Sequence, residues 1–288
     1  MSDSVCIIIA YFGYWPAWIN YFLCSCGYNS SFNWLIYTDC AQLDNVPANV
    51  KIKQISFNDY IALVSDKLAL KFLAVSYYKL CDIKPMLGYI HQDEVEDYDY
   101  WGFGDIDVIY GDLSKYYQPL LSKYQCVSTH STRISGHLCL LKNNQQMQEV
   151  FKKIPDWQDI VADPEHRAFD ERHFSRLFIR YKNFPAWLRN GLLALHSHAR
   201  YACLHEAYTT PNCRIPWMDG SYSFPEEWYW SRGQLSYSGD KPQQTPYLHF
   251  MYWKENWCKE SIDQFAIKKL SQANWIVSKH GIRVASHV

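Results

Sequence analysis

Two aspartates, Asp105 and Asp107, lie in an otherwise uncharged aromatic and aliphatic stretch, WGFGDIDVIYG at 101–111. The residues that follow them, at 108–110, favour an extended backbone. In a strand, residues two apart share a face, so both carboxylates would lie on one side, roughly 7 Å apart. Like charges so placed raise each other's pKa unless a cation keeps both ionised, and carboxylate oxygens suit Mg²⁺ or Mn²⁺. The pattern predicts a divalent-metal site; the alternative is two aspartates on the wet face of an edge strand.

Alternating strands and helices are expected to position this pair. Apolar or alternating runs predict strands at 5–10, 34–38 and 50–55, and helical spacing predicts helices after Pro16 and over 66–78. Such alternation is typical of a mostly parallel, doubly wound sheet, which binds ligands at the carboxyl ends of its strands. Three candidate residues follow predicted strands: Tyr11, Asp39 and Asp105.

The composition of the 288-residue chain narrows the classes of function. The formal net charge is −1 without a basic block, so we expect no nucleic-acid partner. Aromatic residues make up 17% of the chain, and tyrosine and tryptophan offer surfaces on which sugars can stack. The ten cysteines show no Cys-x-x-Cys pair, and the N-terminus shows no signal-peptide pattern. We therefore expect reduced thiols and a cytoplasmic protein, with membrane contact at most peripheral, at the inner face.

Three segments together resemble a known family. IIAYFGYWP at 8–16, KLCDIKP at 79–85 and WGFGDIDVIYG at 101–111 resemble bacterial GT-A-fold glycosyltransferases of the polysaccharide and lipopolysaccharide loci. The resemblance covers roughly 5–145. It implies an α/β, Rossmann-related fold with a mostly parallel central sheet flanked by helices and an irregular acceptor-binding C-terminal half. It also implies transfer of a hexose from a nucleotide sugar, UDP favoured, to a glycan or lipid-linked saccharide in capsule or lipopolysaccharide synthesis.

No linker or internal repeat divides the chain, so we expect one domain over 1–288. Within it, 1–112 would bind the nucleotide, 113–260 would bind the acceptor and carry catalysis, and 261–288 would form a helical tail. The tail prediction rests on apolar residues at helical spacing: Ile262, Phe265, Ala266 and Leu270.

The resemblance implies a metal set of Asp105, Asp107 and His249 for Mn²⁺ or Mg²⁺. His249 is followed five residues later by Lys254, as in the metal-and-phosphate segment of retaining GT-A galactosyltransferases, although the family's usual glycine is missing. A histidine among aromatics also has a purely structural alternative. Lys254 would contact the donor phosphates, and a retaining outcome is slightly favoured.

The same resemblance places Lys79 or Lys84 near the donor phosphates and Asp82 near the base or ribose. The alternative is a solvated helix terminus with an ordinary salt bridge. Asp39 would accept a hydrogen bond from the uracil imide, unless it simply stabilises a turn. Tyr11 would lie in a loop that faces the donor.

Two further segments follow the predicted metal motif. His137 precedes an apolar strand-like run and would contact a sugar hydroxyl or else stabilise a turn. Asp170 and Glu171 resemble the Asp-Glu helix start that several GT-A families place at the reacting carbon, where one would act as a base or stabilise an oxocarbenium-like centre. Acids also favour helix N-termini for electrostatic reasons alone.

Two rival functions belong to other classes. A haloacid-dehalogenase-like sugar phosphatase also carries Asp-x-Asp after a strand, but normally on the first strand, with Thr or Val where this chain has Ile109. A non-catalytic carbohydrate-binding protein would explain the aromatic content but does not need clustered acids.

Overall fold

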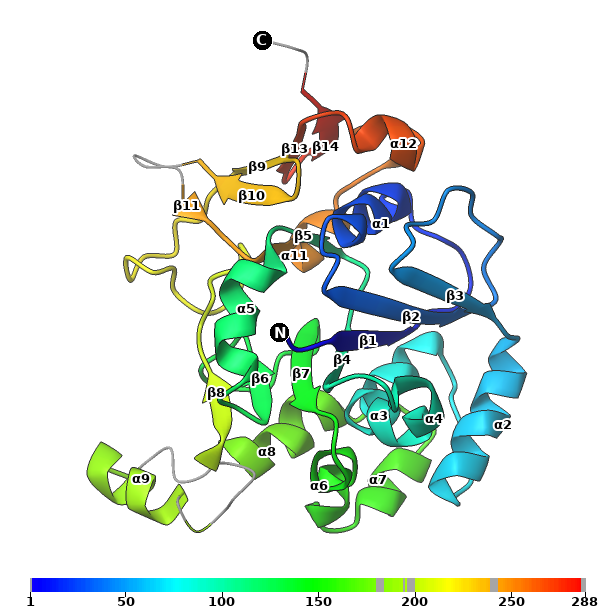
Figure 1. Cartoon of the computed structure of the whole chain (residues 1–288), viewed down its shortest axis with the longest axis vertical. Coiled ribbons are helices and arrows are strands. Elements are labelled where there is room, and N and C mark those ends of the chain that lie inside the picture. The colour runs from blue at the N-terminus through cyan, green and yellow to red at the C-terminus, as the bar shows by residue number, and fades with distance from the viewer. Residues whose placement is uncertain (1, 180–183, 194, 196–199, 239–242, 286–288) are drawn as a thin grey trace.

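The computed structural model describes residues 2–179, 184–193, 195, 200–238 and 243–285 (Figure 1). Its centre is a seven-stranded sheet in which β7 alone runs against its neighbours and the other pairs are parallel. In spatial order the strands are β3 (Val50–Gln54), β2 (Phe32–Thr38), β1 (Val5–Ala10), β4 (Tyr100–Gly104), β7 (Leu138–Lys142), β6 (Cys126–Ser128) and β8 (Ala202–Leu204). The predicted α/β class with a mostly parallel sheet is confirmed.

Successive residues of the central strands enter two different cores. On β1, Ile7 packs into one apolar cluster and Ile8 into the other, and both side chains are fully buried. This is the period-two alternation of a strand covered on both faces, and it explains why β1 is a continuous apolar run.

Helices and short helical turns cover both faces. One face carries α1 (Ile19–Gly27) and α5 (Leu113–Leu121), whose apolar residues belong to the first cluster. The other face is covered by α2 (Phe57–Leu68), the 3-10 helix η1 (Tyr77–Met86), α3 (Leu87–Ile90), α6 (Gln145–Gln148), the 3-10 turn η2 (Val150–Lys153), α7 (Trp157–Ala162), the π-helix η3 (Phe169–Phe174) and α8 (Ser175–Phe178). The remaining helical segments are α4 (Gln92–Val95), α9 (Ala186–Leu193), α11 (Met251–Lys254), the 3-10 turn η4 (Lys259–Ser261) and α12 (Ile267–Leu270).

A second, antiparallel sheet lies beyond α1 in Figure 1. Its strands are β11 (Gln243–Gln244), β10 (Gln234–Tyr237), β9 (Glu227–Ser231), β13 (Trp275–Ser278) and β14 (Gly281–Val284). Trp230 stacks on Trp275 with ring centroids 3.7 Å apart, and its indole donates to the carbonyl of Tyr110, 2.9 Å away. That bond ties this sheet to β5 (Val108–Tyr110), which pairs with β12 (Tyr247–His249).

Two predicted elements are wrong. The helix predicted over 66–78 is instead α2, which begins at Phe57 because Ser56 caps it and ends where Ala69 turns left-handed at φ 51°. The predicted helical tail contains only the short η4 and α12 before β13 and β14, because the β-branched and aromatic side chains of Trp275–Ser278 alternate against β9.

Two other features bear on cellular setting. None of the ten cysteines forms a disulfide in the structure. Among the described residues, no helix is both long and apolar enough to span a membrane.

Candidate metal and donor site

The two aspartates lie between strands rather than within one. Asp105 and Asp107 occupy the bend that joins β4 to β5, so the predicted continuous strand is wrong. Trp18 fixes this bend by donating its indole N–H to the carbonyl of Ile106, 3.0 Å away. The bend lies at the carboxyl end of β4, where a parallel sheet commonly binds its ligand.

His249 reaches the aspartates through the β12–β5 ladder. It pairs with Val108, and the next amide, of Phe250, donates to the carbonyl of Asp107 at 3.1 Å. One ligand atom from each of Asp105, Asp107 and His249 lies within 4.8 Å of the other two. The structure therefore brings together the three residues predicted to hold a metal.

The donor set fits a divalent ion. Two carboxylates and one imidazole converge on one point; carboxylate oxygens suit Mg²⁺ or Mn²⁺, and imidazole nitrogen is a common ligand of transition-metal ions. The other ring nitrogen of His249, Nδ1, lies 3.1 Å from the hydroxyl of Thr210, which orients the ring so that Nε2 faces Asp107 at 3.5 Å.

Two lysines flank the acidic pair. Lys84 Nζ lies 2.5 Å from Asp105 Oδ1, and Lys254 Nζ lies 2.6 Å from Asp107 Oδ2. Burial would raise the pKa of Asp107, but His249 and Lys254 hold it well below its usual range. Burial would likewise lower the pKa of Lys84, but Asp105 and other nearby acidic groups raise it well above its usual value. Asp107 and Lys84 are therefore both charged at neutral pH.

A third carboxylate approaches this cluster from η3. Asp170 is 4% exposed, and burial with the neighbouring charge of Glu171 raises its pKa to about 6, although Lys84 opposes the shift. Gly136 leaves room for it, since a Cβ there would lie 2.9 Å from Asp170 Oδ2. Glu171 Oε2 lies 3.4 Å from Arg133 Nη1.

His137 is buried against His249, one of the three candidate metal ligands. Its ring stacks on that of His249 with centroids 3.9 Å apart, and it is 3% exposed. Burial and the nearby charges of His249 and His130 lower its pKa well below 6.5, so it is neutral at physiological pH. A hydrogen bond between its ring and Ser135 holds it in place.

These groups share a cavity of about 540 Å³. The predicted site residues that line it are Tyr11, Lys84, Asp105, Asp107, His137, Asp170, Glu171, His249 and Lys254. Residues that the sequence did not single out also line it: Trp18, Tyr77, Tyr78, His130, Arg133 and Thr210. No local sequence motif identifies these residues as part of a site. They come from separate segments, and only the fold brings them to the cavity.

Three predicted donor contacts do not line this cavity. Asp39 accepts a hydrogen bond from the amide of Gly13 at 2.7 Å and so holds the turn after Tyr11, where Gly13 has a φ of 100°. Lys79 and Asp82 are fully buried and pair with each other at 2.8 Å. The positions of Asp39, Lys79 and Asp82 outside the cavity do not support the contacts predicted for them with the base, ribose or phosphates of a donor.

A model of a family of unknown function, DUF6625, matches residues 7–281, so the chain belongs to that family. Comparison with curated protein sequences gave no match.

Several solved glycosyltransferases are similar in structure. The galactosyltransferase LgtC, in complex with donor and acceptor sugar analogues, has 11% identity and a TM-score of 0.37 over 71% of this chain and 74% of that one. A glycosyltransferase involved in glycosylation of the major capsid of PBCV-1 has 8% identity and a TM-score of 0.36 over 72% and 83%. Mouse xyloside xylosyltransferase 1, in its apo form, has 8% identity and a TM-score of 0.35 over 86% and 98%. TM-scores this low carry no functional assignment, so the cavity residues themselves must carry it.

Proposed function

We propose that this member of the DUF6625 family is a metal-dependent glycosyltransferase that moves a hexose from a nucleotide sugar, UDP favoured, to a saccharide acceptor. One observation carries the proposal: Asp105, Asp107 and His249 converge at a strand end inside a cavity large enough for a small ligand. A divalent ion held there would neutralise the charge that develops on a diphosphate leaving group.

The two lysines would complete the diphosphate site. Lys84 and Lys254 present ammonium groups directly beside the metal-binding carboxylates. They come from two different elements, η1 and α11, and each contacts a different aspartate, so both can contribute to holding phosphate oxygens. The cavity therefore combines fixed positive charge with a metal site, which favours an anionic donor over a neutral one.

Donor and acceptor would meet between the metal ligands and η3. Asp170 and Glu171 are placed to act on the reacting carbon or the attacking hydroxyl, and His137 supports the metal ligand from below. The half-exposed Tyr77 and the exposed Tyr78 line the same cavity and offer rings on which a nucleobase can stack. We further propose a glycan or lipid-linked saccharide of a surface polysaccharide as acceptor, with retention at the anomeric carbon.

A nucleotide-release assay tests this function. UDP or GDP release from a panel of UDP- and GDP-sugars is measured with Mn²⁺, with Mg²⁺ and with a chelator. We expect metal-dependent release, because donor hydrolysis does not need the acceptor. Asp107→Asn should lower the rate by roughly 100-fold or more, since a charged ligand at the centre of the site is lost.

A matched control keeps the result specific. Asp93→Asn removes a carboxylate from an exposed side chain outside the cavity and should leave release unchanged. Metal-independent release, or equal rates for the two variants, would contradict the proposal. Phosphate release from sugar phosphates, without nucleotide release, would instead indicate the phosphatase alternative.

A further inference from the structure

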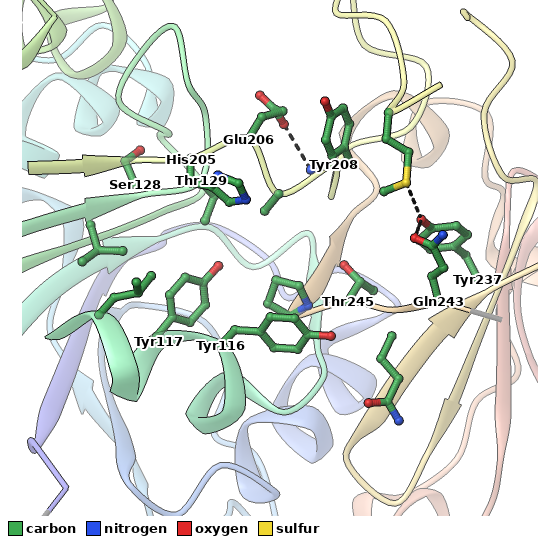
Figure 2. A pocket seen from close by; sticks show the side chains of 16 residues that line it. Tyr116, Tyr117, Ser128, Thr129, His205, Glu206, Tyr208, Tyr237, Gln243 and Thr245 are labelled. Atoms are coloured by element: carbon green, nitrogen blue, oxygen red, sulfur yellow. Dashed lines mark hydrogen bonds between the residues drawn. The ribbon is translucent and has the colours of Figure 1, made fainter. Parts of the chain in front are cut away.

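A second cavity lies away from the metal ligands, between α5, the ends of β6 and β8, and the strands β10 and β11 (Figure 2). Its volume is about 280 Å³, close to the lower limit of roughly 300 Å³ for small-ligand pockets. Four tyrosines contribute to its lining: Tyr116, Tyr117, Tyr208 and Tyr237. A cavity of this size and aromatic content suits one small ring-shaped ligand.

The charges around this cavity disfavour an anion. Among its sixteen described lining residues there is neither a lysine nor an arginine, and Glu206 contributes a carboxylate. The nearby Lys115 has its ammonium group 2.6 Å from Gln244 Oε1. A phosphate or nucleotide would therefore find no cationic side chain in the described lining, whereas Lys84, Arg133 and Lys254 line the cavity of Asp105, Asp107 and His249.

One polar group in the wall is unsatisfied. The Tyr117 hydroxyl is buried without a hydrogen-bond partner, and the side chain is 4% exposed. Figure 2 shows this hydroxyl directed across the cavity toward Thr129 and His205. Burial raises the pKa of Tyr117 well above its usual value, so the group stays protonated. Leaving such a group unpaired costs free energy that a hydroxylated ligand would recover.

Other polar groups in the wall are held in fixed positions. Glu206 Oε2 lies 2.9 Å from His130 Nδ1, and Glu206 Oε1 accepts a hydrogen bond from the amide of Tyr208 at 3.2 Å. The hydroxyl of Tyr237 donates to Gln243 Oε1 at 2.8 Å. Preorganised acceptors beside aromatic rings match a ligand that has apolar ring faces and hydroxyl edges.

We propose that this second cavity binds a neutral saccharide unit, separately from the cavity of the candidate metal ligands Asp105, Asp107 and His249. An acyl chain would fill the volume but leave the Tyr117 hydroxyl without a partner, whereas sugar hydroxyls both donate and accept. The binding needs neither metal nor nucleotide, so it does not depend on the transfer reaction. The His130–Glu206 pair separates the two cavities, since His130 lines one and Glu206 the other.

Titration of the whole chain in the presence of a chelator tests this site. The probes are glucose, galactose, N-acetylglucosamine and lactose, followed by calorimetry or saturation-transfer NMR. At least one saccharide should bind. Tyr117→Phe should weaken that binding about 3- to 10-fold, because it removes one hydrogen bond, while thermal unfolding stays unchanged or rises. Tyr116→Ala should weaken it about 5-fold or more by removing a ring from the wall.

Two further variants locate the bound saccharide. Tyr110→Phe also removes a buried tyrosine hydroxyl, but Tyr110 lines neither cavity, so affinity should not change. Asp107→Asn should leave the binding intact. Loss of binding in that variant would assign the saccharide to the cavity of the candidate metal ligands and overturn the proposal. Absence of binding by all four probes, or equal affinity in the wild type and in Tyr117→Phe, would also overturn it. So would binding of decanoate but of no saccharide.

Discussion

Two lysine–aspartate pairs involve the 3-10 helix η1, and they differ in burial and in role. Lys79 and Asp82 are both fully buried and lie 2.8 Å apart. Lys84 and Asp105 lie 2.5 Å apart, but the side chain of Asp105 is 32% exposed and both residues line the cavity of the candidate metal ligands. Neighbouring charges in one sequence cluster thus lie in two environments. We call Lys79–Asp82 the closed pair, because it is buried in the core, and Lys84–Asp105 the open pair, because it lines the open site, the cavity of the candidate metal ligands.

The buried pair has a positioning role. Asp82 accepts hydrogen bonds from the amides of Arg167 and Phe169, each at 2.8 Å, and Lys79 donates to the carbonyl of Glu165 at 3.0 Å. Burial would raise the pKa of Asp82, but His166, whose Nδ1 lies 3.0 Å from Oδ1, together with Lys79 and those amides lowers it to about 2. These bonds fix the segment that leads into η3, and η3 carries Asp170. The closed pair therefore holds in place a carboxylate of the open site.

The largest expected effect comes from breaking the closed pair. Asp82→Ala should lower the free energy of unfolding by about 3–5 kcal/mol, because Lys79 would stay buried without its counterion. Chemical denaturation measures the loss. Asp93→Ala, at an exposed position, should cost less than about 0.5 kcal/mol. Similar losses for the two variants would show that the closed pair is not structural.

A pH-dependent effect should follow at Asp170. Its pKa in the folded protein is about 6, above the ordinary value of 3.8, so folding favours the protonated form. Its contribution to stability is complete below about pH 4 and is lost as the pH rises through 6. At pH 8, without metal, Asp170→Asn should therefore raise the free energy of unfolding by up to about 3 kcal/mol, with little change at pH 4. Denaturation at both pH values measures this, and an equal effect at both would refute the assignment.

A smaller loss is expected from the open pair. Lys84→Met should cost about 1–2 kcal/mol, because the partner left behind, Asp105, can be solvated from the cavity. The same change should move the midpoint of the Asp170 titration above pH 6, since Lys84 lowers that pKa. NMR titration of the carboxyl group measures the midpoint. A cost equal to that of Asp82→Ala would remove the distinction between the two pairs.

The smallest effect is expected at Lys254. Its side chain is 34% exposed, and the buried Asp107 keeps His249 as a partner 3.5 Å away, so Lys254→Met should change the free energy of unfolding by at most about 1 kcal/mol. Nucleotide release should nevertheless fall about 10-fold or more if Lys254 contacts the donor phosphates. Unfolding and release measured on one preparation separate the two roles, and a loss of stability without a loss of rate would contradict the proposed phosphate contact.

The fold was predictable where a strand is buried on both faces. The apolar runs of β1 and β2 left little choice of structure, and the sheet followed from them. The helix predicted over 66–78 was wrong because α2 begins earlier, where the Ser56 side chain accepts a hydrogen bond from the amide of Asp59, and apolar spacing alone did not show this. The prediction of a helical tail was wrong because Trp275–Ser278 is held extended by pairing with β9, and the local sequence does not reveal this pairing.

The site was predictable where a motif is local. Asp105 and Asp107 stood out by their neighbours, but the contact of Lys84 with Asp105 and the burial of Lys79 depend on how η1 lies against the sheet. Thr210 and Arg133 carry no local signal at all. Their roles follow from long-range packing, which sequence spacing cannot report.

The β12–β5 ladder has a consequence for the order of folding. The two carboxylates come from the first half of the chain, whereas the imidazole arrives with a strand near the C-terminal end. Closing so long a loop is slow and entropically costly compared with local contacts. An ion at this point would therefore bind tightly only after the chain has nearly finished folding, and once bound it would link the first half of the polypeptide to its last third.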